Sequence, residues 1–213
     1  MNSVGQARPS LSTSLILDLV ERAAILILYA WLVARLLNPF GEGFQAIYGL
    51  LLISEGLVIV FLLARRTATF VTHDPADWLL AIAATCGPLL VSPRLGVPWV
   101  SPAIAGAVWL AGTLLQVSAK LALGRSFGCV AAHRGLKRGG PYQWVRHPMY
   151  LGYMLSHIAF LLMNPSLGNL AIYVLCDAVQ LPRILREEQL LGKDPDYQTY
   201  REQVRWRVVP GLF

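Results

Sequence analysis

Long apolar runs alternate with short polar segments along this chain, and the alternation predicts a bundle of membrane helices. A helix needs about 20 apolar residues to cross a hydrocarbon core roughly 30 Å thick. Six runs stand out, of which the third and fifth are short: Leu15–Leu37, Gln45–Ala64, Trp78–Val91, Val97–Leu123, Pro148–Met163 and Leu167–Leu191. We therefore expect an all-α, polytopic integral membrane protein with about six transmembrane segments.

The last two runs are predicted to form a helical hairpin. Pro148–Met163 is too short to span comfortably, and Asn164-Pro165-Ser166 makes a tight reversal before Leu167. The tail after Gly192 is polar but rich in aromatic residues, so we expect it to pack back on the cytoplasmic face. We treat residues 1–213 as a single domain, with N-terminal helices over 1–95 and a C-terminal part over 96–213.

Composition and charge agree with a membrane protein and set its orientation. The 213 residues are 55% hydrophobic and 14% charged, and the formal net charge is +6. If both termini lie inside, 15 of the 18 Lys and Arg residues fall in or beside cytoplasmic segments, as the positive-inside rule requires. The cations are sorted by loop, so nucleic acid is not an expected partner. The sequence thus predicts a cell (inner) membrane protein whose Gly124–His147 loop faces the cytoplasm.

Three ionisable residues, Glu55, His157 and Asp177, fall inside predicted spans. Such residues are costly in a membrane and are paired or functional. These residues either form hydrogen bonds between helices or line an internal polar path, as in a non-catalytic transport or sensor protein. The three cysteines, Cys86, Cys129 and Cys176, lack metal-binding spacing, and no metal site is expected.

The stretch Gly139–Gly152 contains the candidate chemistry, because it combines glycines, three aromatic residues and an Arg-His pair flanked by prolines. Near the end of the sixth run, Arg183 and Glu187 are four residues apart and share one helix face. That pair is either a solvated salt bridge or, placed near His147 and Tyr150, a site for a charged small molecule.

These motifs resemble the isoprenylcysteine carboxyl methyltransferase family, part of a membrane methyltransferase superfamily that also includes phospholipid methyltransferases. The resemblance extends from the fourth span to Pro210. It is carried by Leu123-Gly124-Arg125-Ser126-Phe127-Gly128, Gly135-Leu136-Lys137-Arg138-Gly139-Gly140-Pro141-Tyr142, Arg146-His147-Pro148-Met149-Tyr150-Leu151-Gly152 and Glu187-Glu188. It identifies a bacterial-type relative and is poor at separating members by substrate.

The resemblance implies a site for S-adenosylmethionine built without a Rossmann sheet. The cofactor-binding residues that it implies are Arg134, Gly135, Leu136, Lys137, Tyr142, His147, Pro148, Met149, Tyr150 and Glu187. Arg183 is expected to bind the substrate carboxylate, and Arg183 and Glu187 are the implied catalytic residues. The expected reaction is carboxyl O-methylation of an isoprenylcysteine-like, lipophilic or lipid-anchored acceptor that enters from membrane lipid.

The residue types suit these roles. A donor with a sulfonium, an ammonium and a carboxylate needs both signs of charge and an aromatic wall, such as Tyr142 or Tyr150. Pro148 favours the first turn of a helix, whose free N–H groups can receive a carboxylate. A carboxylate acceptor needs alignment but no base. N-methylation of a phospholipid amine or S-methylation of a small thiol stays open, with Glu187, Glu188 or His147 as the base.

Overall fold

The computed structural model describes residues 11–37, 56, 59–61, 63–64, 70–71, 74–92, 96–126, 132–133 and 135–213. Apart from one two-residue strand pair, the regular elements among these residues are helices. The elements in chain order are α1 (Leu11–Leu37), β1 (Phe70–Val71), α3 (Pro75–Cys86), the 3-10 helix η1 (Gly87–Leu90), α4 (Pro102–Leu123), η2 (Gly124–Ser126), β2 (Ala132–His133), η3 (Gly140–Gln143), α5 (Pro148–Met163), α6 (Leu167–Leu191) and α7 (Pro195–Gln203).

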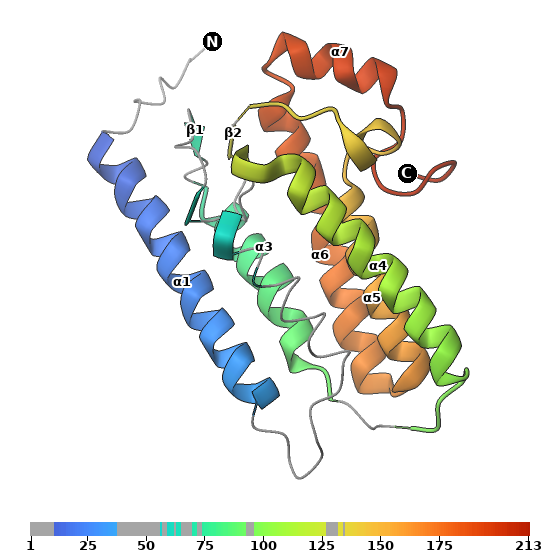
Figure 1. The fold of residues 1–213 in the computed structure, drawn as a ribbon. Helices are drawn as coiled ribbons and strands as arrows, with labels where there is room; N and C mark the ends of the chain where they lie inside the picture. Colours follow the sequence, from blue (N-terminus) through green and yellow to red (C-terminus); the bar gives the residue numbers. More distant parts are fainter. Residues whose placement is uncertain are drawn as a thin grey trace.

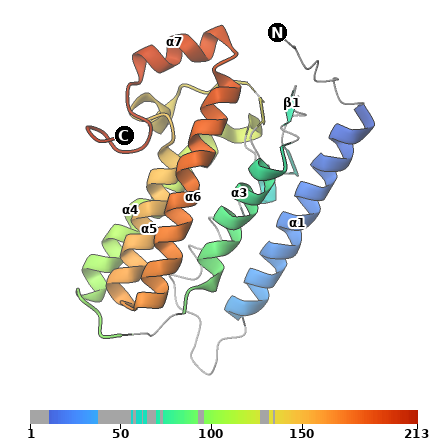
Figure 2. The same cartoon turned by 180° about the vertical axis from the view of Figure 1, so that it is seen from behind.

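The long helices lie side by side, and the short elements gather at one end of them. In Figures 1 and 2, α1, α3, α4, α5 and α6 run along a common direction, whereas α7 and the C-terminus cross one end. The antiparallel pair of β1 with β2 lies at this same end, with Phe70 opposite His133. The loop after α4 and the tail after α6 are therefore on one side of the bundle, as the charge pattern predicts.

Helices α5 and α6 form the predicted hairpin, and their bounds equal those predicted from sequence. The hairpin turns at Asn164, which ends α5, and at Ser166, whose side chain accepts a hydrogen bond from the Asn169 N–H at 3.1 Å. The Asn169 side chain stabilises the same turn, since its Nδ2 donates to the Asn164 carbonyl oxygen at 2.9 Å.

Two predicted spans differ from the observed helices in extent. The run Trp78–Val91 is α3 followed by η1, because the Asp74 side chain caps the helix at Pro75 and Gly87-Pro88 tightens its end. The run Val97–Leu123 becomes helical only at Pro102, where Ser101 is the N-cap. The second predicted span, Gln45–Ala64, lies largely outside the described residues. Glu55 lies outside them as well.

Within the part of the chain that the structure describes, one helix is long and apolar enough to cross a membrane, Pro102–Ser126. The structure therefore does not confirm the count of six spans, which stays a prediction. Outward faces of the bundle are nonetheless apolar, with Leu110, Leu114 and Leu121 exposed on α4 and Val174 and Leu175 exposed on α6. Exposed apolar side chains on these helices are compatible with contact to lipid or to another protein.

Two glycines allow α4 and α5 to approach closely. A Cβ atom at Gly152 would lie 2.6 Å from Gln116 Cγ and 2.8 Å from the Gly112 carbonyl oxygen, and one at Gly112 would lie 2.8 Å from the Gly152 oxygen. Gln116 Nε2 also donates to Ser156 Oγ at 2.9 Å. This glycine contact fixes the first turns of α5, which carry the residues of the candidate site.

The interior of the α5–α6 hairpin contains a polar pair. His157 Nδ1 lies 2.8 Å from Asp177 Oδ1, and the His157 ring stacks on Tyr173 with centroids 4.2 Å apart. The two predicted intramembrane residues that the structure describes are thus bonded to each other. This geometry is that of a hydrogen bond between helices.

Candidate functional site

The candidate site lies where α5 begins and α6 ends. Because the hairpin is antiparallel, the Arg146–Tyr150 stretch comes beside residues 183–188. Tyr150 and Ile184 pack together with Val208 of the tail in one buried cluster. Three segments far apart in sequence therefore meet at this point, on the side of the bundle where α7 lies (Figure 1).

Glu188 is the centre of a buried group that we call the Glu188 cluster: Arg146, His147, Glu188 and Arg207. Arg146 Nε donates to Glu188 Oε1 at 2.7 Å, and His147 Nε2 lies 3.3 Å from the same oxygen. Arg207 Nε donates to Oε2 at 2.9 Å. The side chains of Arg146, His147 and Glu188 are each no more than 6% exposed. Buried carboxylates need such partners, and here side chains of the protein itself compensate the charge of Glu188.

The Glu188 cluster also attaches the tail to the start of α5. The N–H groups of Arg146 and His147 donate to the carbonyl oxygens of Trp206 and Arg207 at 2.9 and 2.7 Å. The Arg146 guanidinium donates to the carbonyl of Val204 at 3.0 Å. The expected packing of the tail against the bundle is therefore observed, and these hydrogen bonds hold it there.

A second, more open group lies beside the first and consists of Tyr150, Arg183 and Glu187; we call it the Glu187 group. The Tyr150 hydroxyl donates to Glu187 Oε2 at 3.2 Å. The Arg183 guanidinium carbon lies 5.4 Å from the centre of the Tyr150 ring, in cation–π range. Arg183 and Glu187 are half-buried. This group thus presents both signs of charge around one aromatic ring.

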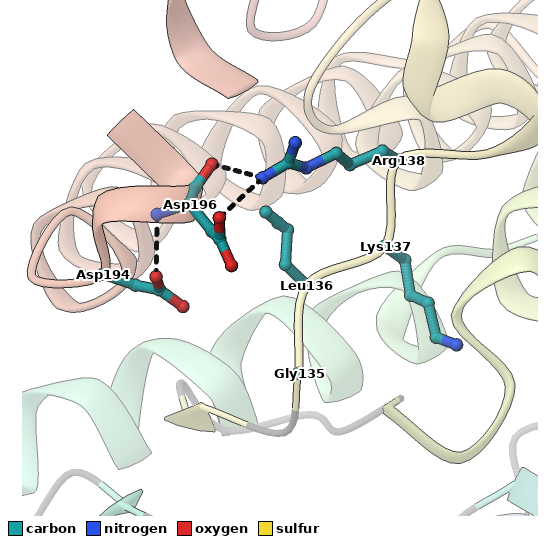
Figure 3. A pocket seen from close by; sticks show the side chains of 6 residues that line it. All are labelled: Gly135, Leu136, Lys137, Arg138, Asp194 and Asp196. Atoms are coloured by element: carbon teal, nitrogen blue, oxygen red, sulfur yellow. Dashed lines mark hydrogen bonds and ion pairs between the residues drawn. The ribbon is translucent and has the colours of Figure 1, made fainter. Parts of the chain in front are cut away.

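The loop before η3 forms one wall of a solvent-facing pocket of about 620 Å³. The pocket is lined by Gly135, Leu136, Lys137, Arg138, Asp194 and Asp196 (Figure 3). Arg138 reaches across to Asp196, with a nitrogen–oxygen distance of 3.5 Å, whereas Lys137 extends the other way. Gly135 has φ +94°, a conformation that favours glycine. Both signs of charge again line one concave surface.

Buried tyrosines connect the pocket to the two glutamates. Leu136 packs on the cluster of Tyr197, Tyr200 and Val204. The Tyr200 hydroxyl donates to the carbonyl oxygen of Tyr142 at 2.7 Å. Burial raises the pKa of Tyr142 well above its usual value, and the charge of Glu187 raises it further. Tyr142 therefore presents a neutral ring and hydroxyl within the electrostatic reach of Glu187.

The structure brings four of the site residues predicted from sequence together. Tyr150, Arg183 and Glu187 form one group, and the His147 ring lies beside Tyr150 with centroids 5.6 Å apart. The segment Gly135–Lys137 lines the pocket instead of contacting this group directly. Pro148 begins α5 and is buried, and Met149 is half-buried. Arg134 lies outside the described residues.

Three contributions were missed by reasoning from the sequence. The sequence indicates Glu188 as part of the Glu187-Glu188 motif and as a possible base, whereas the structure shows it at the centre of the Glu188 cluster. Arg207 and Tyr197 lie in the tail, and local patterns give no indication that either reaches α6. The signal that was available is the Glu187-Glu188 pair itself, since two adjacent carboxylates on a helix cannot both face the same surroundings.

Comparison with known proteins bears on the same region. No curated protein matches the chain at a significant level. The phospholipid methyltransferase family matches residues 100–194, which is less than half of the chain and extends from the start of α4 to the turn before α7. The matched segment includes the Arg146–Tyr150 stretch, Arg183 and both glutamates, and it is consistent with the membrane methyltransferase superfamily.

Proposed function

We propose that the protein is an S-adenosylmethionine-dependent methyltransferase that acts at a membrane on a lipophilic acceptor. One observation carries the proposal. Within the segment matched by the phospholipid methyltransferase family, Tyr150, Arg183 and Glu187 converge on one group beside His147. Their convergence is what a shared ligand site requires.

The side chains present suit the proposed cofactor. Glu187 offers a carboxylate for its ammonium group, and the first turn of α5 offers positive potential for its carboxylate. Tyr142 and Tyr150 supply aromatic surface near a cation. When bound, this cofactor supplies an electrophilic methyl group. Leu136 and the buried tyrosines would exclude water around it.

Carboxyl O-methylation of an isoprenylcysteine-like acceptor is the reaction we favour. Arg183 is a planar, permanently charged donor that can hold one carboxylate oxygen and leave the other free to attack. Its position over Tyr150 limits its movement. The apolar outward faces of α4 and α6 are suited to an acceptor that arrives from lipid. The membrane would be the cell (inner) membrane and the site would face the cytoplasm, as the charge pattern predicts.

N-methylation of a phospholipid amine is the second candidate, because the matched family is named for phospholipid methyltransfer. An amine must lose a proton before or during transfer. Glu187 is the half-buried carboxylate nearest the Tyr150 ring that could accept it, whereas Glu188 is engaged by the Glu188 cluster. A transport or sensor role through Glu55, His157 and Asp177 is less well supported, since His157 and Asp177 bind each other.

Transfer of a radiolabelled methyl group into membrane lipid extract by the purified full-length protein tests the proposal. A base-labile label indicates a carboxyl ester, and a base-stable label in phospholipid indicates an amine acceptor. Arg183→Ala should reduce ester formation by about a hundredfold or more, because the acceptor oxygen loses its alignment. Absence of any transfer by the parent protein, with several membrane extracts, would contradict a methyltransferase.

Arg186→Ala is the matched control. Arg186 lies one turn further along α6, but its guanidinium pairs with Asp74 and with Asp77, the latter at 2.9 Å, at the α3 end. Transfer by this variant should stay within about twofold of the parent, since its ion pairs join α6 to the start of α3 and do not involve Tyr150, Arg183 or Glu187. Equal losses in both variants would mean that Arg183 acts on the helix and not on the acceptor.

A further inference from the structure

The Tyr197 side chain has a buried hydroxyl that the chain itself does not use. Tyr197 lies in the first turn of α7, where the Asp194 side chain accepts a hydrogen bond from the Asp196 N–H at 2.9 Å. Its side chain is 2% exposed, and its ring meets the Tyr200 ring edge-on, with centroids 5.9 Å apart. Among the residues described, none makes a hydrogen bond with the Tyr197 hydroxyl.

Tyr200 shows that a buried tyrosine of α7 can have a hydrogen-bond partner for its hydroxyl. It lies one turn further along α7, is equally buried, and its hydroxyl donates to the Tyr142 carbonyl. Buried hydroxyl groups nearly always have a partner, and an unpaired one destabilises the fold. An unpaired hydroxyl beside a candidate binding site therefore indicates a partner that arrives with the ligand.

Tyr197 lies next to residues that line the pocket and within electrostatic reach of the two glutamates. Leu136, which lines the pocket, packs on the Tyr197 cluster, and Asp196 on the same turn lines the pocket too. Burial raises the pKa of Tyr197 well above its usual value, and the charges of Glu188 and Glu187 raise it further. The hydroxyl keeps its proton at any physiological pH and is available as a hydrogen-bond donor.

We propose that Tyr197 is a cofactor-binding residue whose hydroxyl donates a hydrogen bond to an oxygen or nitrogen acceptor of S-adenosylmethionine. The proposal rests on the proposed function. It assigns the contact to the cofactor and not to the lipophilic acceptor, because Tyr197 packs on the loop that lines the solvent-facing pocket. The cofactor has suitable acceptors in its carboxylate, its ribose and its adenine ring.

Two single variants of the full-length protein, Tyr197→Phe and Tyr200→Phe, test this assignment. Binding of S-adenosylhomocysteine is measured for each. Tyr197→Phe should weaken equilibrium binding roughly 3- to 10-fold, the effect of one neutral hydrogen bond. The thermal midpoint of the same variant without ligand should be unchanged or higher, since an unpaired buried hydroxyl has been removed. Tyr200→Phe should instead lower that midpoint, because the Tyr142 carbonyl loses its donor.

The opposite signs separate a ligand contact from a structural role. Parent-like binding by Tyr197→Phe, or a loss of affinity that comes with a lowered ligand-free midpoint, would overturn the assignment. If the parent does not bind S-adenosylhomocysteine at all, the proposed function itself fails, which is a different result. Binding of 5′-methylthioadenosine locates the contact: weakening of both ligands indicates the nucleoside, and weakening of S-adenosylhomocysteine alone indicates the amino-acid portion.

Discussion

Two adjacent glutamates at the end of α6 lie in opposite kinds of surroundings. Glu188 is buried and bound by Arg146, His147 and Arg207 from two other segments. Glu187 is half-buried, and its one hydrogen bond to a described side chain comes from the Tyr150 hydroxyl. Both carboxylate oxygens of Glu188 have partners within the protein, whereas the Glu187 carboxylate can accept a further hydrogen bond. We infer that the chain uses Glu188 to position the site and Glu187 to bind the ligand.

The largest expected effect comes from Glu188→Ala. It leaves the Arg146 guanidinium buried without its carboxylate and releases Arg207, so the free energy of unfolding should fall by about 3–5 kcal/mol. Thermal unfolding in detergent, followed by circular dichroism, measures this loss. Glu187→Ala should change the same free energy by less than about 1 kcal/mol. A larger loss for Glu187 than for Glu188 would reverse the assigned roles.

Gly152→Ala is expected to have an intermediate effect, because it pushes α4 away from α5, which contributes Tyr150 to the Glu187 group. The added methyl would meet Gln116 Cγ at 2.6 Å and the Gly112 carbonyl oxygen at 2.8 Å. Overpacking of this kind costs about 1–3 kcal/mol. Gly168→Ala is the control, since no atom lies within 4 Å of the position its Cβ would take. Equal stability of the two variants would argue against close packing of α4 on α5.

Tyr150→Phe should have the smallest effect of the three and should act on ligand binding more than on the fold. The ring and its contact with Arg183 remain, but the hydrogen bond to Glu187 is lost. Affinity for S-adenosylhomocysteine should change by about 1 kcal/mol or less, measured by calorimetry. A loss of stability comparable to that of Glu188→Ala would place Tyr150 with the structural residues.

The contrast between the two glutamates also shows what the sequence could predict. The bounds of α5 and α6 follow from Pro148, the Asn164–Ser166 turn and the apolar runs, and they agree with the structure. The apolar run Trp78–Val91 contains two elements, because Gly87-Pro88 changes the helix type before the run ends. The two-residue strands β1 and β2 are too short to show an alternating pattern, and they pair across a long stretch of chain.

The residue types at the candidate site are predictable from the sequence, but their partners are not. The Arg146–Tyr150 motif and the four-residue spacing of Arg183 and Glu187 predict a site at one end of the hairpin, where the structure brings Tyr150, Arg183 and Glu187 together. The division of labour between Glu187 and Glu188 depends on contacts 42 and 19 residues apart in sequence. Helical periodicity carries no information about such contacts, and the unpaired hydroxyl of Tyr197 became visible only once its burial was known.

Binding of S-adenosylhomocysteine to the purified full chain, compared with Glu187→Gln, is the most direct test of the central claim. We expect the parent to bind saturably. Glu187→Gln should bind about tenfold or more weakly because a charged hydrogen-bond acceptor becomes neutral, while its thermal midpoint stays close to that of the parent. Parent-like affinity in Glu187→Gln, or the absence of binding by the parent, would contradict a cofactor site at the end of the α5–α6 hairpin.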